Sequence, residues 1–100
     1  MLKGNDLLIK NFIHKGLKKL YADGSTTGIE PVHRRKLKMI LARLETIQNP
    51  SDMNLPGFYF HPLQGSKKKK QYAVKVDKNW RVIFKFDGTD AYDVDYIDYH

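Results

Sequence analysis

Residue types that can move protons or bind phosphates recur in the second half of the chain. His61 follows an aromatic run, Arg81 follows the tryptophan, and the final triplet is Asp98-Tyr99-His100. A histidine titrates near pH ~6.5 in the unperturbed state, so it can give or take a proton at neutral pH. An arginine can bind a phosphate and the charge that develops on it. This set is suited to acid–base chemistry on a phosphate group.

RNA is the substrate that such a set could cleave without a metal ion. RNA supplies its own nucleophile, the 2′-OH, so cleavage requires only a base, an acid, cations and orientation. DNA lacks this hydroxyl and could not be cut in the same way. The tyrosines of the chain could in addition stack on unpaired bases of the RNA. Taken singly, His61 also fits a half-buried strand histidine and Arg81 a surface charge. The hypothesis therefore depends on their being brought together.

Other chemistries have less support. The chain has no cysteine, which excludes disulfides and thiolate sites. Its four histidines lack metal-ligand spacing within any one element, and residues 24–28 lack the Gly-Lys-Ser/Thr ending of a phosphate-binding loop. Asp93, Asp95, Asp98 and His100 could be imagined around a hard cation, but strand alternation points the first two away from the last two. We expect no metal site.

The net charge of +7 is unevenly distributed along the chain. Residues 1–86 carry all 18 Lys and Arg against 6 acidic residues, which gives +12, whereas residues 87–100 carry 5 acidic residues and no Lys or Arg, which gives −5. A basic body indicates a polyanionic partner. The run Lys67-Lys68-Lys69-Lys70 fits either a solvated turn or a basic finger that contacts the phosphates of a large RNA. In the second case binding would weaken steeply with salt.

Composition predicts a single domain over residues 1–100. The chain is 41% apolar, enough for one core. No stretch approaches the roughly 18 apolar residues of a membrane span, and the N-terminus has no signal-peptide pattern. These features, with the absence of cysteine, indicate a cytoplasmic protein with no membrane partner.

Hydrophobic periodicity predicts an α+β fold, with two helices packed on a mainly antiparallel sheet of about four to five strands. Residues 7–12 are expected as a short edge strand, and residues 14–21 and 33–48 as helices, the second ended by Asn49-Pro50. The change to a period of two then predicts four strands, at residues 58–63, 72–77, 80–86 and 91–99.

Alternation along the last strand predicts where the site lies. A core sheet should finish in a polar rim, at which His61, Arg81 and the C-terminal triplet would meet. Five residues should share one face of that strand, which begins apolar and becomes polar at its end: Tyr92, Val94, Tyr96, Asp98 and His100.

Five motifs carry a resemblance to a known family, and together they span the chain from Ile9 onward. The chain resembles the HigB branch of the RelE superfamily, the bacterial toxins of toxin–antitoxin pairs often called plasmid-maintenance killer proteins. The motifs are His14-Lys15-Gly16-Leu17-Lys18, Pro56-Gly57, Phe60-His61-Pro62-Leu63-Gln64-Gly65, Asn79-Trp80-Arg81-Val82-Ile83-Phe84 and Val94-Asp95-Tyr96-Ile97-Asp98-Tyr99-His100.

The resemblance implies the RelE-like microbial ribonuclease fold and an endoribonuclease that cuts mRNA in the A site of the 70S ribosome, without metal or organic cofactor. It also implies a helix-turn-helix antitoxin, HigA-like, through which alone the toxin reaches operator DNA. By position, His61, Asp98 and His100 match the acid–base and orienting residues. Tyr99 matches a residue near the substrate base, and Arg81 the arginine near the scissile phosphate.

Two features depart from the family pattern. Gln64 stands where the family often has lysine. Either Lys67 to Lys70 supply the missing cation, or the enzyme is slower, or that lysine is not essential; Gln64 and Lys67 to Lys70 are expected to contact RNA or ribosome. Residues 1–8 form an N-terminal extension. The alternative function is a nucleic-acid-binding module without catalysis, or a degenerate toxin that acts only as a co-repressor with its antitoxin.

Overall fold

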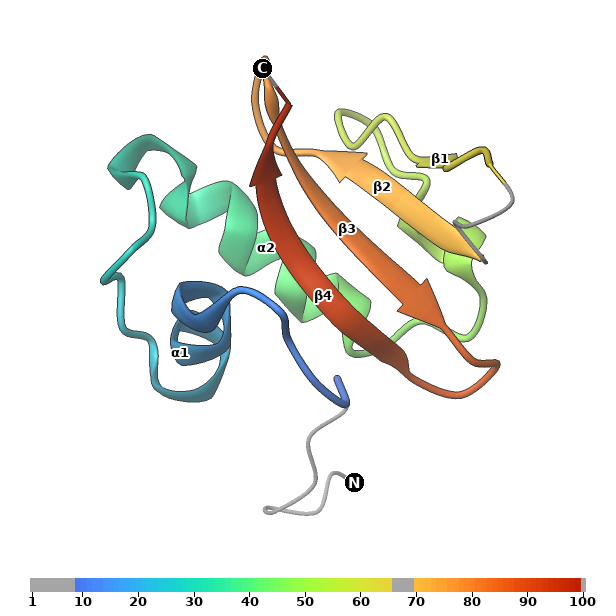
Figure 1. Cartoon of the computed structure of the whole chain (residues 1–100), viewed down its shortest axis with the longest axis horizontal. Coiled ribbons are helices and arrows are strands. Elements are labelled where there is room, and N and C mark those ends of the chain that lie inside the picture. The colour runs from blue at the N-terminus through green and yellow to red at the C-terminus, as the bar shows by residue number, and fades with distance from the viewer. Residues whose placement is uncertain (1–8, 66–69, 100) are drawn as a thin grey trace.

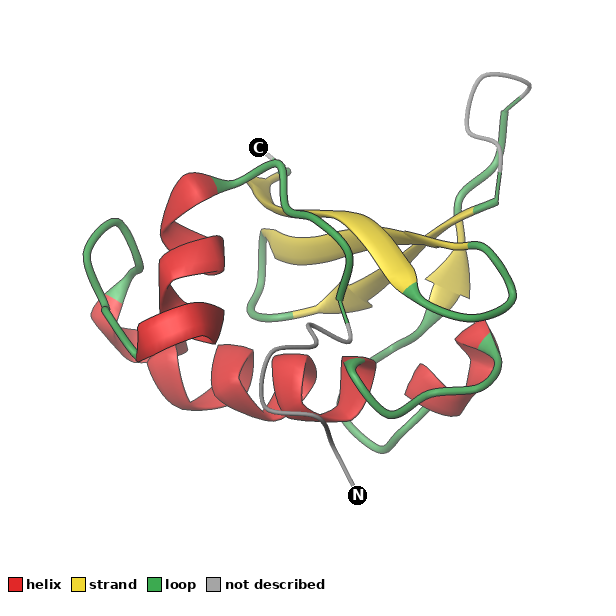
Figure 2. Ribbon diagram, turned by 90° about the horizontal axis from the view of Figure 1, so that it is seen from below, coloured by secondary structure: helices red, strands yellow, loops and turns green. Residues whose placement is uncertain are grey.

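The computed structural model describes residues 9–65 and 70–99, in which two helices lie on one face of a four-stranded antiparallel sheet (Figures 1 and 2). This confirms the predicted α+β class. The strands follow one another in the order β1-β2-β3-β4. The elements are α1 (Lys15–Asp23), α2 (Arg34–Leu44), β1 (His61–Pro62), β2 (Gln71–Lys75), β3 (Trp80–Phe86) and β4 (Ala91–Asp98), with single 3-10 turns at Pro31–His33 and Pro50–Met53.

Helix α1 has a cap at each end. His14 Nδ1 accepts the N–H of Leu17 at 3.0 Å, so this histidine precedes the helix that was predicted to start there. At the other end Gly24 adopts a left-handed φ of 78°, and its N–H binds the carbonyl of Leu20 at 3.0 Å. Leu17 and Leu20 are the buried residues of the helix.

Helix α2 buries an apolar stripe of Leu37, Ile40, Leu41 and Leu44 but ends earlier than predicted. Its last residue is Leu44, after which the Thr46 hydroxyl donates to the carbonyl of Arg43 at 2.8 Å. Asn49 and Pro50 do not end the helix; they begin a separate 3-10 turn. The Asp52 carboxylate closes that turn by accepting the N–H groups of residues 48 and 49, which lower its pKa.

The N-terminal segment runs beside β4, as the predicted edge strand would. Ile9 and Phe12 form isolated parallel bridges with Ala91 and Val94, and Ile9 is fully buried. The first two residues of the predicted strand, 7 and 8, lie outside the described residues. The first strand of the predicted meander is shorter than expected, two residues instead of six.

A β-bulge at Asp93 overturns one predicted side-chain direction. Residues that pair directly across strands share a face. Lys85 pairs with Tyr92 and Ile83 with Asp95, so Tyr92 and Asp95 lie on the same face although they are three residues apart. Asp93 has φ of 50° and takes up the extra residue. Tyr92 therefore points away from the face that carries Val94 and Tyr96, contrary to strict alternation.

His33 is the buried polar residue of the core among the residues described, with 3% of its surface exposed. Its Nδ1 lies 2.7 Å from the Tyr96 hydroxyl, and its Nε2 lies 3.0 Å from a carboxylate oxygen of Asp77. A carboxylate only accepts, so Nε2 carries a proton and, in the neutral ring, Nδ1 accepts from Tyr96. Trp80 stacks on Tyr96 and meets the edge of the histidine ring. The start of α2 is thereby joined to β4 and to the turn between β2 and β3.

We expect the substitution His33→Ala to lower the free energy of unfolding by about 2–4 kcal/mol, because it opens a cavity and removes the acceptor to which the buried Tyr96 hydroxyl donates. The neighbouring Val32 is 81% exposed, and Val32→Ala should change stability by less than about 0.5 kcal/mol. Urea unfolding of both variants measures the difference. Equal stabilities would show that the histidine bonds do not hold the core together.

Candidate active site

The face of the sheet opposite the helices carries two of the predicted site residues, His61 and Arg81. Figure 2 shows both helices on the other side of the sheet. We call this surface the outer face. Cross-strand pairing assigns to it His61, Ala73, Lys75, Arg81, Ile83, Lys85, Tyr92, Asp95 and Ile97.

Arg81 and Tyr99 come together at the end of the outer face nearest the C-terminus. The guanidinium carbon lies 5.6 Å from the centroid of the tyrosine ring, within the range of a cation–π contact. Tyr99 donates its N–H to the carbonyl of Asn79 at 2.7 Å, which continues the pairing of β4 onto the turn before β3. The tyrosine ring is 44% exposed, so it can meet a ligand.

Arg81 also holds the turn between β2 and β3. Its Nη1 donates to the carbonyls of Asp77, Lys78 and Trp80 at 2.9, 3.3 and 3.0 Å. It is half-buried, so it is more than a surface charge. A guanidinium has five N–H donors, and one nitrogen makes all three bonds. The arginine can therefore brace the turn and still offer donors to a phosphate.

His61 is exposed on the edge strand β1, with a defined tautomer. Its Nδ1 lies 3.2 Å from the carbonyl oxygen of Tyr59. A carbonyl can only accept, so Nδ1 is the protonated nitrogen in this contact. In the neutral ring Nε2 is then the acceptor, which is the state required of a general base.

Tyr59 and Lys75 belong to the same surface and were missed by the sequence analysis. The Lys75 ammonium lies 4.8 Å from the centroid of the Tyr59 ring, and the Lys75 backbone N–H donates to the carbonyl of Phe58 at 2.7 Å. Lys75 is also the direct cross-strand partner of Arg81. The turn predicted at residues 78–79 would have paired Lys75 with Val82; the observed loop is one residue longer and shifts the partner to Arg81. Nothing in the sequence indicates the left-handed backbone of Tyr59, which has φ of 48°.

The remaining predicted residues do not converge on one point. Strands β1 and β3 are two strand spacings apart, about 9–10 Å, so His61 and Arg81 can act together only on a ligand that spans β2. Asp98 pairs with Trp80, and its side chain is therefore directed away from the outer face at the end of β4. Gln64 is exposed beyond β1. Lys67, Lys68, Lys69 and His100 lie outside the described residues.

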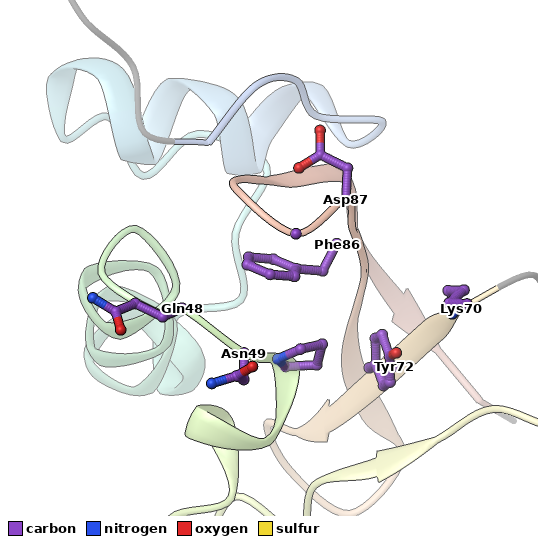
Figure 3. A pocket seen from close by; sticks show the side chains of 8 residues that line it. Gln48, Asn49, Lys70, Tyr72, Phe86 and Asp87 are labelled. Atoms are coloured by element: carbon purple, nitrogen blue, oxygen red, sulfur yellow. The ribbon is translucent and has the colours of Figure 1, made fainter.

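A hollow of about 500 Å³ lies at the opposite end of the sheet (Figure 3). Lys70 lines it together with Tyr72, Asn49 and Asp87. Lys70 precedes β2, whereas Lys75 ends that strand, so the hollow and the Arg81–Tyr99 contact are separated by the length of β2. We therefore place the candidate active site on the outer face.

Across residues 9–65 and 70–99 no three His, Asp or Glu side chains are grouped so as to hold a metal ion. In the same residues no helix is long and apolar enough to cross a membrane.

Two lysines, Lys36 and Lys75, contact the segment that carries Tyr59. Lys36 of α2 donates to the carbonyl of Gly57 at 2.7 Å and lies 5.5 Å from the ring centroid of Phe58. Burial lowers the pKa of Lys36, and the nearby ammonium of Lys75 lowers it further. The segment that carries Tyr59 and His61 is thus braced from the helix side by one lysine and from the strand side by another.

Comparison with known proteins identifies the family of this chain. Residues 10–100 match the model of the RelE-like toxin HigB of type II toxin–antitoxin systems. The chain belongs to this family. It is also 34% identical over 93 residues to the protein named Endoribonuclease HigB of Proteus vulgaris, an alignment that covers 93% of this chain and all of the relative. These findings confirm the resemblance to HigB, and membership in a toxin–antitoxin family implies an antitoxin partner for this HigB-family toxin.

Asp77 makes the stability of the Arg81 turn dependent on pH. The N–H of Lys78 and the ring of His33 lower the pKa of the Asp77 carboxyl below its ordinary value of 3.8. A lowered pKa in the folded state contributes stability above the unfolded-state pKa, and this contribution is lost as the pH falls through the folded-state pKa. We expect the wild type to exceed Asp77→Asn in unfolding free energy at neutral pH, with a difference that shrinks below about pH 4. Urea unfolding of both proteins between pH 7 and pH 2 measures this difference, and a constant difference would contradict the assignment.

Proposed function

We propose that this toxin is an endoribonuclease that cuts mRNA in the A site of the 70S ribosome and so inhibits translation. One observation carries the proposal: in a chain of the HigB family, His61, Arg81 and Tyr99 are exposed or half-exposed on the side of the sheet away from the helices. A relative that aligns over its whole length is named an endoribonuclease. A shallow, open surface suits a substrate as large as ribosome-bound mRNA.

In the proposed reaction a general base removes the proton of the 2′-OH, and the resulting oxygen attacks the adjacent phosphorus. The bond from phosphorus to the 5′-oxygen breaks, and a general acid gives that oxygen a proton. The products are a cyclic phosphate and a free 5′-OH. His61, Asp98 and His100 share the roles of base, acid and orienting group, while Arg81 binds the phosphate and its developing charge. Tyr99 stacks on a base next to the cut.

Lys75 can supply the positive charge that is missing at Gln64, where the family often has lysine. Gln64 can donate a hydrogen bond but brings no charge, and it is exposed at the margin of the outer face. Lys75 brings an ammonium to the same face, directly across from Arg81. We propose that it supplies the cation expected from the lysine of the family pattern, with Gln64 and Lys67 to Lys70 as further contacts to RNA or ribosome.

The finer identity of the partners belongs to the same proposal. The antitoxin is a helix-turn-helix, HigA-like protein that neutralises the toxin, and the toxin reaches operator DNA only through it. The net charge of the toxin, +7, favours an acidic surface on that partner.

A second function has one observation in its favour. Arg81 donates three hydrogen bonds to the turn, which gives it a structural reason to be present even without catalysis. A degenerate toxin that binds nucleic acid or acts as a co-repressor would keep this arginine. It would bind RNA in a salt-dependent way and produce no new RNA ends.

Mapping of mRNA 5′ ends in a purified translation system, with and without ribosomes, separates these functions. We expect new ends in register with codons, only when ribosomes translate. New ends on naked RNA alone would show a ribonuclease that does not depend on the ribosome. No new ends in either case would favour the non-catalytic alternative.

We expect His61→Ala to lower kcat by about 10²-fold or more, the usual scale for one general acid–base group, without a change in folding because the side chain is exposed. Thr89→Ala, at the exposed turn between β3 and β4, is the control and should cleave like the wild type. Cleavage rates in the translation system measure both variants. A fully active His61→Ala would remove this histidine from the mechanism.

A further inference from the structure

The outer face carries two aromatic and two cationic side chains in a row, which we call the aromatic–cation strip: Tyr59, Lys75, Arg81 and Tyr99. The two cations are direct cross-strand partners in the middle of the strip. An aromatic ring lies against each of them, with Tyr59 4.8 Å from Lys75 and Tyr99 5.6 Å from Arg81. The strip therefore has two cations between two exposed rings.

Tyr59 is held in place at a conformational cost. Its φ of 48° lies in the left-handed region that non-glycine residues seldom adopt, and such strain persists where surrounding contacts enforce it. The enforcing contacts are present on both sides: Lys36 binds the carbonyl of Gly57, and the backbone of Lys75 binds the carbonyl of Phe58. The result is a tyrosine that is 68% exposed, with the Lys75 ammonium against its ring. Folding alone gives no reason for this arrangement.

The chemistry of the strip matches single-stranded RNA. Exposed aromatic rings stack on unpaired bases of any sequence, and lysine and arginine between them bind the phosphate that joins successive nucleotides. We infer that Tyr59 and Lys75 form a second nucleotide subsite, in which one base stacks on Tyr59, a neighbouring base stacks on Tyr99, and the intervening phosphate contacts Lys75 and Arg81. The inference rests on the proposed function in taking RNA as the ligand.

This subsite would also explain how one RNA strand can reach both His61 and Arg81, which lie on strands two spacings apart. Because His61 Nδ1 contacts the carbonyl of Tyr59, a base on the Tyr59 ring brings its own ribose and phosphate close to that histidine. The strand of RNA then crosses β2 in the direction from His61 to Arg81. Tyr59 is in this view a positioning residue and has no role in proton transfer.

The test measures binding to a labelled RNA hexanucleotide with a 2′-O-methyl group at every position, so that no cleavage can occur. We expect Tyr59→Ala to weaken binding about tenfold and Tyr59→Phe to stay within about twofold, because stacking uses the ring and not the hydroxyl. Tyr92→Ala is the matched control, since Tyr92 lies on the same outer face beside Lys85 at the far end, and it should also stay within about twofold. Lys75→Gln should weaken binding and make it less dependent on salt.

A hexanucleotide that lacks its two central bases separates stacking from charge. The wild type should bind it more weakly, and Tyr59→Ala should then bind it as well as the wild type does. Tyr59→Gly guards against misfolding, because glycine adopts a φ of 48° without strain, and this variant should be at least as stable as the wild type while it binds as poorly as Tyr59→Ala.

Three results would overturn the subsite. Tyr59→Ala could bind the intact hexanucleotide as tightly as the wild type does. Tyr59→Ala could lose as much affinity for the probe without central bases as for the intact probe, or the wild type could bind neither probe measurably. Failure of the proposed function is distinguishable from these results. If the wild type produces no new RNA ends but binds the hexanucleotide through Tyr59, the subsite is supported and the nuclease function is refuted. If the wild type cleaves, and Tyr59→Ala binds and cleaves as well as the wild type does, the nuclease function is supported and the subsite is refuted.

Discussion

The two hydrogen bonds of His33 join the helices to the working end of the sheet. One ring nitrogen reaches Tyr96 of β4 and the other reaches Asp77, which begins the turn before β3. The carbonyl of Asp77 in turn accepts from Arg81, and the same turn binds the backbone of Tyr99. A buried ring that must satisfy both nitrogens allows little movement of any of these groups. The geometry of the candidate site thus begins inside the core.

The uncovered outer face follows from the distribution of apolar residues in the strands. Val74, Val82, Phe84 and Val94 point toward the helices and are fully buried, so the helices pack on that side alone. On the other side, small or apolar residues such as Ala73 and Ile83 are interspersed with Lys75 and Arg81. Ala73 and Ile83 are themselves buried, so Lys75 and Arg81 supply the charge of this face, which suits a polyanion.

Periodicity was sufficient to predict the architecture because long, regular elements express it directly. The bounds of β3 were predicted without error, and the two helices and the four strands of the meander were found in the correct order. The predictions failed where the backbone departs from regular geometry. Alternation cannot reveal the extra residue at Asp93, which reversed the direction of Tyr92, and composition cannot reveal the positive φ of Tyr59. Family motifs pointed to His61, Arg81 and Tyr99, whereas Lys75 and Tyr59 required knowledge of which strands are neighbours.

The bulge at Asp93 also ties together the two ends of the folded domain. Asn11 donates its side-chain amide to the Asp93 carboxylate at 2.7 Å and accepts the Asp93 N–H at 3.0 Å, across 82 positions of sequence. Ile9 and Phe12 extend this contact along β4. Such distant pairing is slow to form and requires that both partners exist. During synthesis, the N-terminal segment must therefore wait for residues 91–94, and the outer face has no completed fourth strand before then. A nascent chain of this toxin therefore acquires its assembled outer face only when β4 has been made.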